Sequence, residues 1–197
     1  MLVWRDALGL VEPSSRSAID TSMTAIANTF STATALSLDA DVLAEWADAF
    51  RVLQGADCWR THGEWIMREH PTFGPGITAR FAAAREITDD QEAAAEATAR
   101  RARLCLDELL GDDGVIVLPA SPDVAPLRDA TREQKDQLRP ATLRLTCAAG
   151  LAGLPTMSLP AARGAGGLPI GVAMIGARHS DEHLLRLATQ LEAAAAF

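Results

Sequence analysis

Short apolar runs of strand character recur in the second half of the chain and constrain its fold more than any other feature. Val115–Leu118 reads VIVL and is followed by proline, and Thr156–Leu159 and Ile170–Ile175 also read as strands. Continuous apolar runs are typical of strands that are buried on both faces of a sheet. The chain is therefore predicted to place its sheet between layers of helices.

Helical patterns separate these strands along the chain. The first begins at Glu12–Ser15, where a hydroxyl could cap the helix, and its apolar face is Ile19, Met23, Ile26 and Phe30. Two further strands are predicted at Leu2–Trp4 and Thr32–Leu38. The other predicted helices are Asp41 to about Glu69, which could be broken at Gly55 or Gly63, Ile77–Ile87, a run to Leu110 with a capping box at Thr88–Gln91, Arg132–Gly150, and a last one from near Ser180.

The predicted fold class is thus α/β, with a mixed β-sheet covered by helices, in a single domain over residues 1–197. A chain of this length can bury roughly 70% of its unfolded surface, which is enough for a substantial core. The Ala-rich tail, Ala193–Ala196, is expected to fray.

Composition narrows the function classes. The net charge is −8, which argues against broad electrostatic binding to nucleic acid or to an anionic membrane. No run approaches the ~20 apolar residues of a membrane span. The three cysteines, Cys58, Cys105 and Cys147, are scattered, which indicates reduced thiols and a cytoplasmic location. Cys105 and Cys147 lie in apolar helical patterns, so they are predicted to be small buried apolar residues.

Two segments near the C-terminus carry a family resemblance. Leu151–Ala161 reads LAGLPTMSLPA, and Gly167–Glu192 reads GLPIGVAMIGARHSDEHLLRLATQLE. Following VIVLPASPDVAP in this order, they resemble the C-terminal portion of an amidase-signature family amidase. Ala47–Thr88 more weakly resembles bacterial amidases near the indole-acetamide hydrolases. The resemblance implies a partial amidase-signature fold and hydrolysis of a carboxamide to a carboxylate and ammonia, without metal or cofactor.

The same resemblance implies catalytic residues that have no counterpart here. The family uses a Ser nucleophile, a bridging Ser held by a cis peptide, and a Lys base, beside a Gly- and Ser-rich oxyanion loop. The only Ser-Ser pair, Ser14–Ser15, has no flanking glycine. The only Lys, Lys135, lies downstream in the charged run REQKD, which is interpreted as a solvated helix face. No catalytic residue is therefore assigned. The chain is predicted to be inactive alone, as an amidase portion without the N-terminal catalytic half.

Four residues are candidates for substrate binding. Trp59, His62 and Trp65 could line a pocket for an aromatic amide, with His62 as its polar group. The alternative is a helix whose Trp residues pack in the core. Arg144 lies among apolar residues, where it could bind a substrate carboxylate or form a structural ion pair.

Other functions remain open from the sequence. His179 and His183 fit H-x-x-E-H, a pattern of some zinc hydrolases, but a loop-to-helix junction with incidental histidines is the favoured interpretation. No metal site is assigned. The chain could also be a non-catalytic binding or scaffold module, or one half of a split amidase. A sheet without its neighbouring strands exposes unpaired edges, so the expected partners are a complementary amidase fragment or a second copy of the chain. A small-molecule amide is expected only once the fold is complete.

Overall fold

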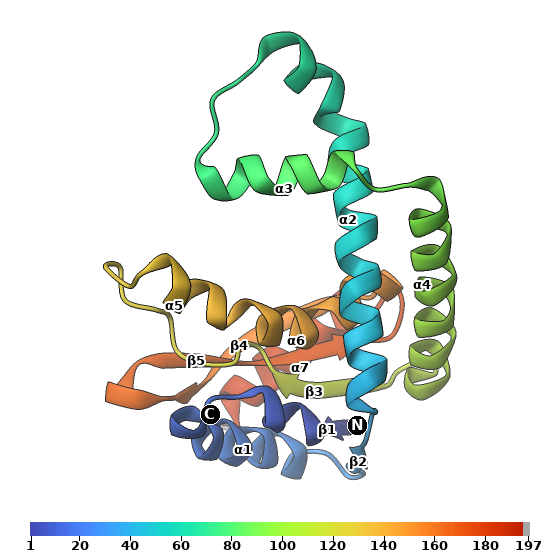
Figure 1. Ribbon diagram of the computed structural model, residues 1–197. Coiled ribbons are helices and arrows are strands. Elements are labelled where there is room, and N and C mark those ends of the chain that lie inside the picture. The colour runs from blue at the N-terminus through green and yellow to red at the C-terminus, as the bar shows by residue number, and fades with distance from the viewer. Residues whose placement is uncertain (195–197) are drawn as a thin grey trace.

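A mixed sheet of five strands forms the centre of the computed structural model, which describes residues 1–194 (Figure 1). The strand order is β2-β1-β3-β5-β4, with β1 parallel to β2 and β3, and β5 antiparallel to β3 and β4. The strands are β1 (Leu2–Trp4), β2 (Thr34–Leu36), β3 (Val115–Pro119), β4 (Thr156–Arg163) and β5 (Pro169–Gly176). The predicted mixed sheet is confirmed, and the last two residues of the Ala-rich tail lie outside the described residues.

Helices follow the predicted order along the chain. They are α1 (Pro13–Asn28), α2 (Ala40–Glu69), α3 (Pro75–Arg85), α4 (Asp89–Leu110), α5 (Arg132–Gln137), α6 (Arg139–Ala152) and α7 (Asp181–Ala193), with short 3-10 helices η1 (Asp6–Leu10) and η2 (Ala165–Gly167). Within residues 1–194, none of these helices is long and apolar enough to cross a membrane.

The strands send alternate side chains to opposite faces of the sheet and so build two apolar cores. Trp4 and Ile116 face the layer formed by α2, α4 and α6. Val117 and Met174 face the layer formed by α1 and α7. All four side chains are 0% exposed. The continuous apolar runs of the sequence therefore correspond to strands buried on both sides, as predicted.

The start of α1 differs from the prediction. No hydroxyl caps this helix, because Pro13 occupies its first turn and the N-cap residue, Glu12, makes no side-chain cap bond. Proline suits this position since its fixed φ matches the helix and its missing N–H would be unpaired anyway. Ser15 is instead fully buried. The predicted apolar face is confirmed for Ile19, Met23 and Ile26, which are at 0% exposure, whereas Phe30 lies beyond the end of α1.

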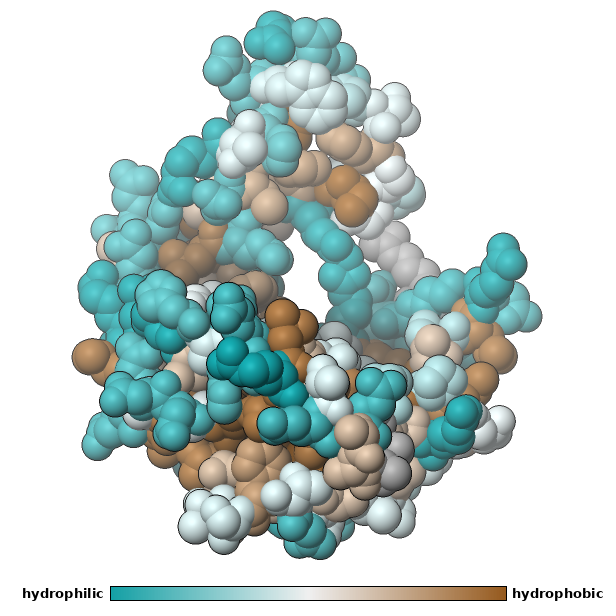
Figure 2. All heavy atoms as spheres, turned by 180° about the vertical axis from the view of Figure 1, so that it is seen from behind, coloured by the Kyte–Doolittle hydropathy of each residue, from teal (hydrophilic) through white to brown (hydrophobic). Residues whose placement is uncertain are grey.

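α2 is one unbroken helix of 30 residues, about 45 Å long, although its glycines suggested a break. It contacts α4 and α6 in the body of the molecule and α3 beyond it. Residues 54–85, here named the α2–α3 projection, rise away from the sheet (Figure 1). The space-filling view from behind shows an opening between this projection and the body (Figure 2).

The predicted helix Arg132–Gly150 is two helices, α5 and α6, that meet at Leu138. Pro140 lies in the first turn of α6, because proline has no N–H to continue the hydrogen-bond ladder of a preceding helix. The capping box of α4 is confirmed: Thr88 Oγ1 accepts from the Gln91 N–H, and the Gln91 side chain accepts from the Thr88 N–H.

The boundaries of other elements also differ from those predicted. β2 is shorter than predicted, while β4 continues to Arg163 through an irregularity between Leu159 and Ala162. α7 begins directly after Ser180, whose side chain makes no cap hydrogen bond. Acidic Asp181 and Glu182 occupy the first turn of α7, where they meet the positive end of the helix dipole.

Candidate functional site

A cleft opens beside the Pro-containing loop that follows β3. Loop residues 121–126 form one side, α5 and the first turn of α6 form another, and the start of β5 completes it. Its volume is about 420 Å³, which is within the range of small-molecule sites. Ala120 N donates to Gly171 O at 3.0 Å, so the sheet fixes the loop relative to β5.

Two hydrogen bonds hold this loop to the start of α1. Ser15 Oγ donates to Asp123 Oδ1 at 2.6 Å, and Glu12 N donates to Pro122 O at 2.8 Å. Within the loop, Ser121 Oγ donates to Asp123 O at 2.8 Å. A buried hydroxyl needs a partner, and Asp123 provides it for Ser15. The contact with α1 therefore sets the position of one wall of the cleft.

Ser15→Ala is expected to lower the free energy of unfolding by about 1–3 kcal/mol, because it removes a buried hydrogen bond to a carboxylate. Urea unfolding measures the loss. The freed loop should also be cleaved faster by trypsin after Arg128. Exposed Ser17, on the same helix, provides the control, since Ser17→Ala is expected to stay within about 0.5 kcal/mol of the parent. Equal stability and equal cleavage of the two variants would refute this role of Ser15.

The Ser-Ser pair and the single Lys lie on different helices, α1 and α5. Ser15 is 0% exposed and donates to Asp123, whereas Ser14 lies on the exposed side of α1. Lys135 lies on α5 and donates from Nζ to Arg128 O at 3.1 Å. The absence of an assigned catalytic residue stays a prediction.

Trp59, His62 and Trp65 all lie on the projecting end of α2. The His62 ring meets Phe81 of α3 edge-on with centroids 6.2 Å apart, and Trp65 meets Phe73 in the same way at 6.1 Å. Trp65 remains 42% exposed, so it is not the core residue that the alternative interpretation expected. These rings join α2 to α3 and to the connecting loop.

Trp59 lies on the same helix and, like His62, meets a residue of α3. The Arg85 guanidinium lies 6.0 Å from the centroid of its ring, at the outer limit of a cation–π contact. The structure thus places the three aromatic candidates together on the α2–α3 projection. Their role in substrate binding stays a prediction.

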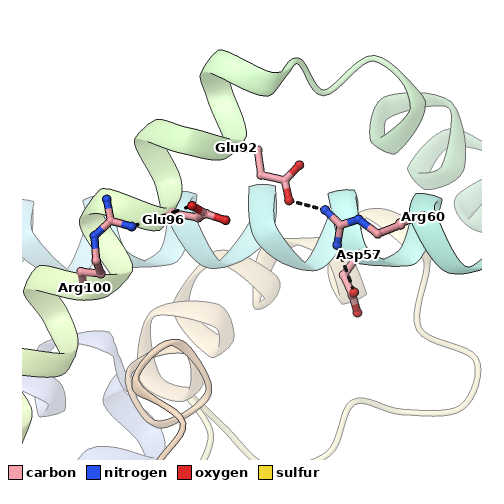
Figure 3. Close-up of polar contacts among 5 residues, drawn as sticks. All are labelled: Asp57, Arg60, Glu92, Glu96 and Arg100. Atoms are coloured by element: carbon pink, nitrogen blue, oxygen red, sulfur yellow. Dashed lines mark hydrogen bonds and ion pairs between the residues drawn. The ribbon is translucent and has the colours of Figure 1, made fainter.

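Ion pairs tie the projection to α4 (Figure 3). Arg60 of α2 donates a hydrogen bond to Glu92 in the first turn of α4 and pairs with Asp57 at 3.4 Å. The bond to Glu92 raises the pKa of the Arg60 guanidinium. Glu96 and Arg100 form a further pair within α4 at 3.8 Å. Of these contacts, the one between Arg60 and Glu92 joins α2 to α4 near the start of the projection.

Arg144 lies on α6, apart from the aromatic candidates. Among the described residues its side chain makes no hydrogen bond or ion pair, so the structural pair considered for it is not present. Arg178 makes such contacts instead. It donates to Ala152 O at 3.1 Å, to Gly153 O at 3.2 Å and to the Asp107 carboxylate at 3.1 Å. The sequence did not single out Arg178, because its partners lie far along the chain.

The histidine pattern does not form one helical turn. His179 precedes α7 and has a left-handed φ of 63°, whereas His183 lies within the helix. Within residues 1–194, no three His, Cys, Asp or Glu side chains come close enough together to hold a metal ion. Cys147 is fully buried, as predicted, and burial raises the pKa of its thiol to about 11. Cys105 is only partly buried.

Comparison with known proteins agrees with this architecture. The model of the Amidase family matches residues 11–185. Amidase 1 of Arabidopsis thaliana is 30% identical over 147 residues, which make up 75% of this chain. A crystal structure of an amidase superposes with a TM-score of 0.80 over 98% of the chain at 22% identity, and a chain from a vestigial protein complex related to the origins of an s-triazine catabolic enzyme gives 0.77 at 21% identity.

The two structural matches define the fold class, an α/β sheet protein of the amidase type. The chain belongs to the amidase family, since the family model covers most of its residues. The resemblance in the C-terminal segments is thereby confirmed. The chain spans 34% of the length of the Arabidopsis relative, and 45% and 42% of the two solved chains.

Proposed function

We propose that this chain is the C-terminal portion of an amidase and acts only together with a polypeptide portion that supplies the catalytic residues. The complete assembly would hydrolyse a carboxamide to a carboxylate and ammonia. One observation carries the proposal: an amidase structure covers 98% of this chain, whereas the chain covers 45% of that amidase. The buried, hydrogen-bonded Ser15 and the position of Lys135 on α5 support it.

In this assembly the cleft beside loop residues 121–126 forms one wall of the substrate site. Its position supports this role, because it lies where the loop after β3 meets the start of β5 and is open to solvent on one side. Large apolar side chains are exposed close by, Leu127 after the loop and Leu168 before β5, at 71% and 45%. Exposed apolar groups beside a cleft are suited to contact with a further layer of protein.

The free edge of the sheet at β4 also supports association with a complementary amidase portion. β4 is an edge strand of 8 residues. Gly176 N donates to Pro155 O, so Pro155 points its backbone oxygen toward β5. Because successive residues of an antiparallel strand alternate in direction, the backbone N–H and C=O groups of Thr156 and Ser158 point away from β5. Unpaired edge groups favour the addition of another strand. The complementary portion of the amidase would supply that strand.

The α2–α3 projection supplies a second contact surface. Trp65, Met67 and Ile77 are exposed on it at 42%, 48% and 42%. They lie on the part of the molecule that the opening separates from the body (Figure 2). The complementary portion would fill this opening and cover these side chains. A structural relative from a protein complex supports an assembly of more than one chain.

The purified chain, tested alone on a panel of aliphatic and aromatic carboxamides, is expected to release no ammonia above the buffer blank. The reason is that the nucleophile and base of acyl transfer are expected in the complementary portion, while Ser15 and Lys135 of this chain are engaged in other hydrogen bonds. Turnover that survives repeated purification and disappears on replacing a Ser of this chain would overturn the proposal. A stable, monomeric, inactive chain that does not associate with amidase fragments would instead favour a stand-alone binding module.

A further inference from the structure

Two cations gather at the cleft although the chain carries a net charge of −8. Lys135, the only Lys of the chain, and Arg139 both line it. Lys135 lies in the last turn of α5 and Arg139 begins α6, so the junction of the two helices holds both side chains on one side of the cleft. The junction at Leu138 thus concentrates positive charge at the site.

Neighbouring acids leave much of this charge uncompensated. Arg139 pairs with Asp136 at 3.6 Å, but the two side chains are 54% and 46% exposed, and such pairs are weak in water. Lys135 donates only to a backbone oxygen, that of Arg128, among the contacts within residues 1–194. Asp123 also lines the cleft, and one of its carboxylate oxygens accepts the Ser15 hydroxyl. Both cations therefore remain able to meet an incoming anion.

The remaining lining of the cleft is apolar or small. Val124 stands on the loop, and Pro169 and Ile170 stand at the start of β5. A volume of about 420 Å³ accommodates a ring or a short chain between this wall and the cations. An apolar wall facing a cationic wall is complementary to a ligand that has a hydrophobic body and an anionic end.

We propose that the cleft binds an organic carboxylate, with an apolar body against Val124 and Ile170 and the carboxylate between Lys135 and Arg139. The inferred substrate is an amide that also carries a carboxylate, and this part of the inference rests on the proposed function. The anion is held by charge-assisted hydrogen bonds from an ammonium and a guanidinium. Because the carboxylate product of hydrolysis shares this chemistry, the experiment must separate the two sources.

Binding to the intact chain, measured by calorimetry and by the amide NMR shifts of Ile170 and Gly171, tests the site without any need for catalysis. The probes are 4-carbamoylbenzoate and terephthalamide, which have nearly the same shape and differ in the anionic group. The carboxylate is expected to bind about tenfold more tightly at low salt, and the difference should shrink as salt rises. Equal affinity for both probes would overturn the inference.

Variants locate the site. Lys135→Gln and Arg139→Gln are each expected to weaken carboxylate binding about threefold, and the double variant should bind both probes equally. Lys135→Arg should retain binding, and Arg103→Gln on α4, which removes one exposed positive charge elsewhere, should leave it unchanged. Circular dichroism confirms that each variant is folded. If Arg103→Gln weakens carboxylate binding as much as Lys135→Gln and Arg139→Gln do, the effect comes from net charge alone. That result would refute the site.

Activity in a reconstituted amidase separates substrate from product. If the anion belongs to the substrate, 4-carbamoylbenzoate should have a higher kcat/KM than terephthalamide, and the double variant should remove that preference. If benzoate inhibits the enzyme but the two amides are hydrolysed with equal kcat/KM, the cleft binds the carboxylate product. That result would overturn the claim that the substrate carries a carboxylate. If the chain binds the carboxylate but never supports hydrolysis in any mixture, the binding site stands and only the proposed amidase function is refuted.

Discussion

Gly114→Ala is expected to lower the free energy of unfolding by about 3 kcal/mol, a large fraction of the stability of a typical domain. Gly114 connects α4 to β3, and its N–H donates to Leu110 O at 2.8 Å. A Cβ built at this position would lie 2.2 Å from that same oxygen and 2.8 Å from the Leu110 Cα. Both atoms belong to the backbone, so no side-chain rotation can relieve the overlap. The end of α4 or the start of β3 must move.

Urea unfolding followed by circular dichroism measures this effect, with Gly9→Ala as the matched control. Gly9 lies in η1 with no atom within 4 Å of its built Cβ, so the same substitution there is expected to change stability by about 0.5 kcal/mol or less. A Gly114→Ala chain as stable as the Gly9→Ala chain would show that the α4–β3 connection is not as tight as described.

Ile116→Ala is expected to cost about 2–5 kcal/mol, since it leaves a cavity in the middle of the sheet. Ile116 is 0% exposed and lies on β3, which has a neighbouring strand on both sides. It lies opposite Leu2 of β1 and Ile175 of β5. Neighbouring strands cannot close over the cavity without breaking their register. The lost contacts therefore are not replaced.

Leu104→Ala provides the control for this core substitution, because Leu104 lies on α4 and is 71% exposed. It is expected to change stability by about 0.5 kcal/mol or less. The slope of the unfolding free energy against urea should be the same in both variants if both unfold in two states. A loss at Ile116 no greater than that at Leu104 would contradict the central position of β3.

The sequence predicted the sheet and most helices because their signals are local. VIVLP, the Thr88 capping box and the apolar face of α1 each depend on residues within a few positions, and each appears as expected. The boundary between α5 and α6 was missed because Pro140 is compatible with a first turn as well as with a kink. The hydroxyl cap expected within Glu12–Ser15 was wrong, because a hydroxyl at a helix start can also bond to a distant residue, as Ser15 does to Asp123.

The candidate site was less predictable, since it is made by long-range contacts. Asp123 meets Ser15 across 108 positions of the chain, and Arg178 meets Asp107 across 71. Nothing in the local sequence around either residue encodes such a pairing. Trp59, His62 and Trp65 were recognised as a cluster because one helix carries them all. Lys135 was assigned to a solvated helix face, and only the fold shows that it also lines a cleft beside Arg139.

Reconstitution tests the central claim most directly. The chain is mixed with a separately produced amidase fragment that carries the Gly- and Ser-rich catalytic segment and lacks the region matched here, and ammonia release is measured for each alone and for the mixture. The account predicts inactive components, a complex that elutes as one species, and hydrolysis that a Ser→Ala change in the added fragment abolishes. Ser-dependent hydrolysis by this chain alone, or a mixture that neither associates nor hydrolyses, would contradict it.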